Sequence, residues 1–274
     1  MITLTSLLRR VLLTMCLVAF PTMATASDFV RLTDRDDLFG WEAVGRVDLG
    51  GQGFCTGVLI ATDLVLTAAH CVYDRDGKLI PAQAIKFRAG LRDGESMAER
   101  RASRLVAAKG YVPADGMTAI NIRNDAALIE LDTPILATTA APFVVHEDAR
   151  AGDRVSVVSY GRGRDAALSW QRDCGVLWEQ QGIYGFDCSI TFGTSGAPVF
   201  YRNGRRARIL ALVSGGAVEN GKFVNAYGMK LPELVSEMKR SLRALPSRTN
   251  LSSQGGALRG GNAGGAKFSS SGGS

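Results

Sequence analysis

Residues 55–71 read CTGVLIATDLVLTAAHC, a segment in which two cysteines bracket an apolar run that ends at His70. Far downstream, residues 193–198 read GTSGAP, with Ser195 between two glycines. A serine hydroxyl is a weak nucleophile at neutral pH, so its chemistry needs an imidazole that accepts its proton. The two stretches together therefore predict a serine hydrolase.

A third stretch, NDAALIEL at residues 124–131, supplies a carboxylate at Asp125. Asn-Asp before a strand is often only a turn. The apolar residues that follow nevertheless predict that Asp125 is buried, where an unpaired carboxylate is costly and an imidazole N–H is a suitable partner. We expect Asp125 to hold one tautomer of His70 and to stabilise its protonated form. The second histidine, His146, has no comparable context.

The three motifs, TAAHC at 67–71, NDxxLIxL at 124–131 and GxSGxP at 193–198, occur in the order His, Asp, Ser. In these residues and in this order the chain resembles the trypsin/chymotrypsin family of serine proteases. The pattern is most similar to that of bacterial secreted members.

The resemblance implies a catalytic triad of His70, Asp125 and Ser195. His70 would act as general base and then as general acid toward the leaving amine, and the N–H groups of Gly193 and Ser195 would form an oxyanion hole. It implies a serine endopeptidase that works through an acyl-enzyme on Ser195 and needs no cofactor.

Two departures from the commonest family pattern concern activation. Thr194 stands where the animal digestive enzymes carry an Asp that receives a newly formed amino terminus, and no Ile-Val-Gly-Gly start is present. Activation by that insertion is therefore not expected. Ala197 in place of a glycine leaves the catalytic groups intact.

The specificity pocket is predicted from the same resemblance. Ser189 would lie at its floor, and Ser214, Gly215 and Gly216 would form its wall and pair with the substrate backbone. A neutral floor disfavours Arg or Lys, and Asp187 would reach the pocket only if the register differed by two residues. Bacterial glutamyl-specific members carry a pocket histidine where this chain has Val213, so we expect apolar or small side chains in the pocket.

Short β-branched runs separated by Gly, Asp, Asn and Arg predict an all-β fold closed into barrels. The resemblance makes these two six-stranded antiparallel β-barrels of the chymotrypsin-like type with a C-terminal helix. Helical spacing of apolar residues over 231–245 predicts that helix, and we expect its apolar face to pack on the second barrel. The predicted strands are 44–47, 56–60, 64–67, 84–87, 126–131, 154–159, 197–200, 209–214 and 223–229.

The two ends of the chain differ from its body. Residues 1–26 are predicted to be a cleaved signal peptide, with Ser27 as the mature start. A membrane anchor is not favoured, because the apolar run of about ten residues is shorter than the ~20 that an anchor needs. We expect an N-terminal extension or short propeptide over 27–40, a peptidase domain over 41–245 with the barrel boundary near 146, and a disordered Gly/Ser-rich tail over 246–274. The destination would be periplasmic or extracellular.

Removal of Cys16 with the signal leaves four cysteines, an even number that indicates two disulfides in an exported chain. Four cysteines allow three pairings. The family brackets its histidine with a disulfide, which implies Cys55 with Cys71 and leaves Cys174 with Cys188.

The formal charge of +6 comes mainly from the ends, because two arginines of the predicted signal peptide and three cations of the predicted tail leave +1 for residues 27–245. A nucleic-acid-binding face is therefore not expected. Asp74 to Gly77 resembles the start of a calcium loop, but the later ligands are missing and Asp-Gly is a common turn, so no metal site is expected. The expected partners are protein or peptide substrates, with a monomeric protein and no membrane span after signal cleavage.

Two alternatives use the same fold. A non-catalytic binding relative would typically have lost one of the three catalytic residues, all of which are present here. An esterase with the same triad would differ only in its pocket.

Overall fold

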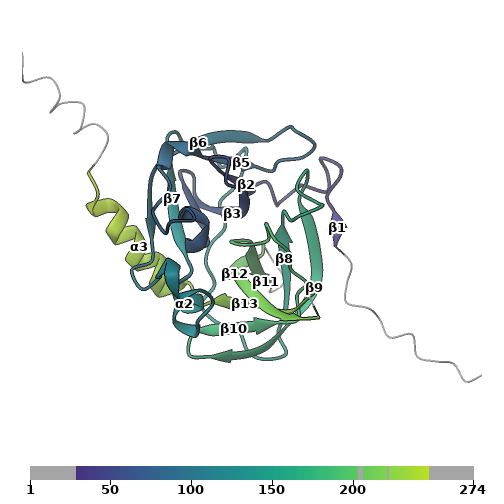
Figure 1. Cartoon of the computed structure of the whole chain (residues 1–274). Coiled ribbons are helices and arrows are strands. Elements are labelled where there is room, and N and C mark those ends of the chain that lie inside the picture. Colours follow the sequence, from purple (N-terminus) through teal and green to yellow (C-terminus); the bar gives the residue numbers. More distant parts are fainter. Residues whose placement is uncertain (1–28, 203–205, 221, 247–274) are drawn as a thin grey trace, which may run out of the picture.

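The structure is a computed structural model that describes residues 29–202, 206–220 and 222–246 (Figure 1). The predicted signal peptide, Ser27 and the predicted tail beyond Pro246 lie outside these residues.

The first barrel closes in the order β2-β3-β4-β7-β6-β5 and occupies the upper part of Figure 1. Its strands alternate in burial: along β5, Ile85, Phe87 and Ala89 point inward, while the two cations between them are half-buried. The strands are β2 (Val44–Leu49), β3 (Phe54–Ala61), β4 (Leu64–Thr67), β5 (Ile85–Ala89), β6 (Ala98–Ala107) and β7 (Ala127–Leu131).

The second barrel is the closed ring β8-β9-β10-β13-β12-β11, and the two-residue strand β1 (Val30–Arg31) adds to the edge of β9. All these strand pairs are antiparallel. The strands are β8 (Arg154–Ser159), β9 (Ser169–Gln180), β10 (Ile183–Phe186), β11 (Pro198–Tyr201), β12 (Arg208–Glu219) and β13 (Lys222–Met229). The predicted fold class, two six-stranded antiparallel barrels, is confirmed.

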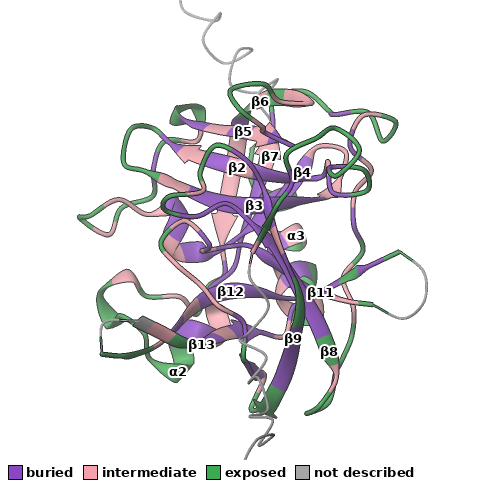
Figure 2. Cartoon of the chain, turned by 90° about the vertical axis from the view of Figure 1, so that its right-hand side faces the viewer, coloured by how far each residue is buried: buried purple, intermediate pink, exposed green. Residues whose placement is uncertain are grey.

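An aromatic cluster joins the two barrels. Phe200 on β11 lies 5.0 Å from Trp41 and 4.6 Å from Phe143, measured between ring centroids, and Trp41 also contacts Trp170 on β9 at 5.1 Å. Trp41 precedes β2, and Phe143 lies on the connection between the barrels, so rings from four segments of the chain meet there. Figure 2 shows buried residues along β3, β11 and β12, with exposed residues in the outer loops.

The C-terminal helix α3 (Pro232–Ala244) was expected to pack on the second barrel, and this prediction was wrong. α3 contacts β6 and β7 of the first barrel, beside which it runs in Figure 1. Its buried residues Val235, Met238 and Leu242 join the core that includes half-buried Leu105 on β6. A helix in this position removes its own apolar residues and those of the first barrel from water.

A short helix leads into Asp125. Helix α2 (Ala119–Asn124) begins at Thr118, whose side chain accepts a hydrogen bond from Asn121 N–H, and it ends at Asp125. The buried Asn121 amide accepts from Val112 N–H and donates to the carbonyls of Val112 and Gly116, which holds the preceding loop. The single-turn 3-10 helices are η1 (Ala69–Val72), η2 (Ala82–Ala84) and η3 (Pro113–Asp115).

Both disulfide bonds join the cysteines that the resemblance paired. Cys55 and Cys71 have Cα atoms 6.3 Å apart, and Cys174 and Cys188 have Cα atoms 5.1 Å apart. The second disulfide ties β9 to the residues that follow β10.

The N-terminal segment beyond Asp28 packs against the body. Leu32 and Leu38, within the predicted extension or propeptide, are 2% and 3% exposed and belong to the main core. Residue 146, where we propose the boundary between the barrels, lies on the connection between β7 and β8. No helix within the described ranges is long and apolar enough to cross a membrane.

The aromatic cluster generates a stability prediction. Phe200→Ala removes a fully buried ring and should lower the free energy of unfolding by about 3 to 5 kcal/mol, measured by chemical denaturation. Phe39→Ala is the matched control, because that ring is 82% exposed and its loss should change stability by less than about 0.5 kcal/mol. Equal effects of the two substitutions would show that the cluster does not hold the barrels together.

Candidate active site

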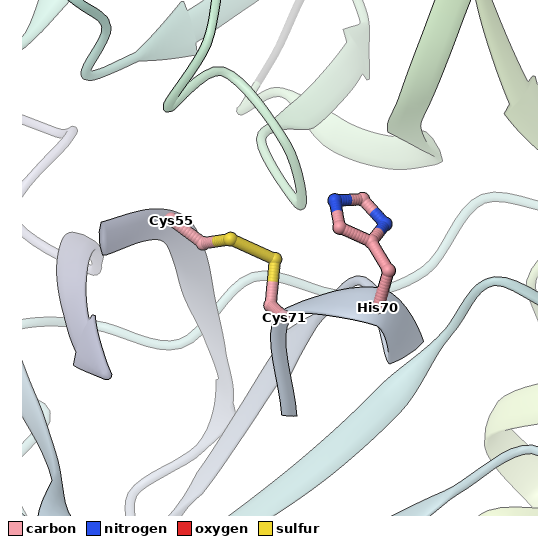
Figure 3. Close-up of side chains that lie close together, drawn as sticks. All are labelled: Cys55, His70 and Cys71. Atoms are coloured by element: carbon pink, nitrogen blue, oxygen red, sulfur yellow. A yellow bond between two sulfur atoms is a disulfide. The ribbon is translucent and has the colours of Figure 1, made fainter. Parts of the chain in front are cut away.

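His70 is positioned by the fully buried strand β4 and by the short turn η1 that follows it. The disulfide between Cys55 and Cys71 anchors this turn to β3, and Figure 3 shows the imidazole projecting from the same turn as Cys71. The His70 side chain is 34% exposed. One side of the ring is therefore accessible from solvent while the backbone beneath it is fixed.

Asp125 brings His70 and a residue of the second barrel together. Its carboxylate is 2% exposed and accepts three hydrogen bonds. Oδ1 accepts from His70 N–H at 2.9 Å, and Oδ2 lies 2.8 Å from His70 Nδ1 and accepts from Ser214 Oγ at 2.6 Å. The burial expected for Asp125 is compensated by these donors.

The environment of His70 raises its pKa above the ordinary 6.5. Desolvation lowers the pKa, but the charge of Asp125 and its hydrogen bond to the ring outweigh that effect. The protonated imidazole is therefore stabilised where it lies. A ring in this environment takes up a proton more readily than a free imidazole does.

Tyr111 also lies near this carboxylate, and sequence reasoning did not single it out. Burial, followed by the charge of Asp125 and the neighbouring Tyr73, raises the pKa of Tyr111 to about 12. The two tyrosine rings lie 5.7 Å apart.

The segment that carries Ser195 packs on the segment that carries His70. Thr56 on β3 donates its N–H to Ser195 O at 2.9 Å. Gly196 has a φ of +74°, and a Cβ there would lie 2.3 Å from Thr67 Oγ1 and 2.8 Å from Ala68 N. A glycine is required at this position, because the backbone beside Ser195 lies directly on the residues before His70.

A hydrogen bond to the preceding carbonyl sets the direction of the Gly193 N–H, and a second bond holds the carbonyl of Gly193 itself. Arg162 N–H donates to Phe192 O at 2.7 Å, and Thr56 Oγ donates to Gly193 O at 3.0 Å. In a trans peptide the N–H points opposite to the C=O, so the Gly193 N–H faces away from Arg162. Within residues 29–202, 206–220 and 222–246, neither this N–H nor that of Ser195 donates to a protein acceptor.

The predicted pocket residues occupy neighbouring segments. Ser189 N–H donates to Oε1 of the buried Gln171 at 3.0 Å. Gly215 and Gly216 lie on β12, opposite Tyr227 and Ala226 of β13, and Met117 packs over Gly215. Ser214 is buried and bonds to Asp125, a contact that its predicted place in the pocket wall did not include.

Asp187 makes its hydrogen bond away from the predicted pocket wall, Ser214 to Gly216. Its carboxylate accepts the N–H of Gly175 on β9, next to the disulfide of Cys174 and Cys188. This contact gives the carboxylate a partner on β9.

Two groups of side chains have the spacing of metal ligands. In one, the sulfurs of Cys55 and Cys71 lie within 4.8 Å of a His70 ring nitrogen, and in the other Asp187 lies beside Cys174 and Cys188. In both groups the cysteines are joined in disulfides. Since a metal binds the thiolate, neither group fits a metal site.

Comparison with known proteins agrees with the fold and with the motifs. The family model of the trypsin-like peptidase domain matches residues 55–207, and the chain belongs to this family. The human protein named serine protease 56 is 30% identical over 125 residues, which cover 44% of this chain and 19% of that protein. A trypsin from Sarcophaga bullata is 33% identical over 91 residues, 33% of this chain and 32% of the trypsin. The chain thus matches about a fifth and about a third of these two relatives.

Solved structures share the architecture at low sequence identity. A Glu endopeptidase has a TM-score of 0.62 at 20% identity, covering 74% of this chain and 91% of its own. The protease Anisep from Arthrobacter nicotinovorans has a TM-score of 0.60 at 19% identity, covering 74% and 96%. At these identities the likeness supports the fold alone.

The contact between Asp125 and His70 predicts a measurable shift. In an imidazole NMR titration, the pKa of His70 should lie above the ordinary 6.5. In Asp125→Asn the midpoint should fall below that of the unsubstituted protein, because the charge is lost and desolvation remains. An unchanged midpoint would rule out Asp125 as the cause.

The same contact links stability to pH. A pKa raised in the folded state adds stability below the unfolded-state pKa, and the contribution is lost as pH rises through the folded-state pKa. The stability lost in Asp125→Asn should therefore be larger just below neutral pH than at alkaline pH, as measured by thermal unfolding at both. The opposite order would contradict the assignment.

Proposed function

We propose that the protein is an exported serine endopeptidase that hydrolyses peptide bonds through an acyl-enzyme on Ser195. The observation that carries this proposal is the buried Asp125 carboxylate, which holds both the backbone and the ring of His70. Because Nδ1 donates to Asp125, the unprotonated Nε2 is the nitrogen available to accept a proton. Membership in the trypsin-like peptidase family supports the same conclusion.

The proposed reaction begins when Ser195 Oγ attacks the carbonyl carbon of the substrate and transfers its proton to His70 Nε2. The protonated His70, stabilised by Asp125, then gives this proton to the leaving amine, and the peptide C–N bond breaks. Water attacks the acyl-enzyme with His70 again as base, and Ser195 regains its proton. Asp125 remains ionised throughout.

The N–H groups of Gly193 and Ser195 would stabilise the oxyanion. Both lack a protein acceptor in the described structure, and the bond from Arg162 to Phe192 O fixes the direction of the first. Donors that are aligned before the substrate binds need no reorganisation as negative charge develops.

We propose a narrow apolar pocket with a preference for small side chains. The floor residue Ser189 is neutral, and a side chain at Gly216 would meet Ile190 Cδ1 at 2.8 Å. Ile190 therefore occupies space beside the wall strand. The buried Val213 provides no positive charge for an acidic side chain, so we do not extend the specificity that the name Glu endopeptidase describes to this chain.

The remaining proposals concern context. Two disulfides are typical of chains that mature in an oxidising compartment, which supports export to the periplasm or the medium. We propose protein or peptide substrates and a monomeric enzyme.

The first test is active-site labelling. A fluorophosphonate probe should label Ser195, and Ser195→Ala should abolish the label and lower kcat on peptide substrates by about five to six orders of magnitude. Ser236→Ala, which alters an exposed serine on α3, is the control and should leave both unchanged. Folded, disulfide-intact protein that does not label would instead indicate a binding relative, and ester turnover without peptide turnover would indicate an esterase.

The pocket proposal predicts a change of specificity. Ile190→Ala should raise the ratio of kcat/KM for Phe over Ala at the residue before the cleaved bond by about tenfold or more, measured with matched peptides. Ile120→Ala is the control: it makes the same truncation at a residue that is 63% exposed, and it should leave the ratio unchanged. A ratio that does not respond to Ile190→Ala would place the pocket elsewhere.

A further inference from the structure

Arg164 contacts the residue that precedes Ser195. Its Nη2 donates to Thr194 Oγ1 at 3.0 Å and to Ser159 Oγ at 3.0 Å, and its Nη1 donates to Ser159 O at 2.8 Å. These acceptors are uncharged oxygens at the end of β8 and in the turn that carries Ser195. Thr194 is fully buried, so the guanidinium reaches the inner side of that turn.

The site around Arg164 is shaped to a guanidinium. The ring of Phe29, in the N-terminal segment, stacks on it with the guanidinium carbon 4.0 Å from the ring centroid. A Cβ at Gly161 would lie 2.7 Å from Arg164 Nη2 and 2.7 Å from Thr191 Cγ2, so this glycine leaves the room that the two side chains fill. Burial lowers the pKa of Arg164 to about 10, which leaves the group charged at neutral pH.

Thr194 links the Arg164 guanidinium to the start of the turn through hydrogen bonds. Its Oγ1 also accepts from Thr191 N–H at 3.2 Å, and its own N–H donates to Thr191 O at 3.0 Å. The hydroxyl oxygen therefore lies between the guanidinium and the start of the turn Thr191–Ser195. Loss of the guanidinium would leave this buried oxygen with a weaker set of donors and would free the turn to change its peptide orientations.

We propose that Arg164 is a positioning residue which, through Thr194, holds the turn Thr191–Ser195 so that the N–H groups of Gly193 and Ser195 point toward the oxyanion. This inference rests on the proposed function. The half-buried side chain of Arg164 then supports the turn from its inner side, and the segment that carries Phe29 holds this side chain in place.

The test compares Arg164→Met, which keeps the chain length and the contact with Phe29, with Arg164→Lys and with the control Arg172→Met. Arg172 is exposed and also stacks on an aromatic ring, that of Trp170 at 4.5 Å, but it does not contact Thr194. Hydrogen–deuterium exchange is measured for peptides that contain the turn and for peptides from β3, β4 and α3.

Arg164→Met should accelerate exchange in the turn about tenfold or more with little change in β3, β4 and α3. The rate of fluorophosphonate labelling should fall about a hundredfold and kcat in parallel, with KM within about twofold, because the lost interaction acts on the transition state. Arg164→Lys should restore part of both, and Arg172→Met should behave as the unsubstituted protein.

Unchanged exchange and labelling in Arg164→Met would overturn the proposal, and so would faster exchange throughout the chain, which indicates a merely structural role. If Arg164→Met does not fold, Thr194→Val removes the shared acceptor with little change in shape and carries the same expectations. Failure of the unsubstituted protein to label at Ser195 would reject the proposed function, while the exchange of the turn still decides whether Arg164 positions it.

Discussion

The site depends on the need to satisfy one buried carboxylate. Asp125 lies between α2 and β7 and obtains its donors from the turn after β4 and from Ser214 on β12. The turn belongs to the first barrel, and β12 belongs to the second. Unpaired, the carboxylate would be strongly destabilising, so the barrels must meet with His70 and Ser214 in register at this point. Asp125 thus determines both how the two barrels meet and how readily the His70 imidazole takes up a proton.

Thr56 has a similar role among uncharged groups. This fully buried residue of β3 donates its N–H to Ser195 O and its hydroxyl to Gly193 O, and the same hydroxyl accepts from Tyr160 N–H at 3.0 Å. One side chain therefore joins the histidine-bearing barrel to the serine turn and to the end of β8. A valine at this position would have the same shape and keep the N–H bond to Ser195 O, but it would leave Gly193 O and Tyr160 N–H without the hydroxyl that pairs with both.

Much of this arrangement could be predicted from the sequence, because short motifs with fixed internal geometry carry it. The segments around His70, Asp125 and Ser195 are such motifs, and nine predicted runs correspond to strands of the structure. The strands β1, β6, β9 and β10 were not predicted. In β6 the outward positions hold charged residues such as Glu99, which pairs with Lys86 and Arg88 on β5, so the hydrophobic alternation is weak. The contacts of Thr56, Arg164 and Tyr111 join residues far apart in sequence, and only the closed barrels bring them together.

The position of α3 determines which parts of the molecule could be exchanged with those of a relative. The helix follows β13 of the second barrel, yet its buried face completes the core behind β6 and β7 of the first. A chimaera that joined the first barrel of this chain to the second barrel of a relative would pair β6 with a foreign helix. The unit of exchange is therefore the first barrel together with α3, two pieces that lie on either side of the second barrel in the sequence, and a single crossover at the barrel boundary cannot transfer it intact.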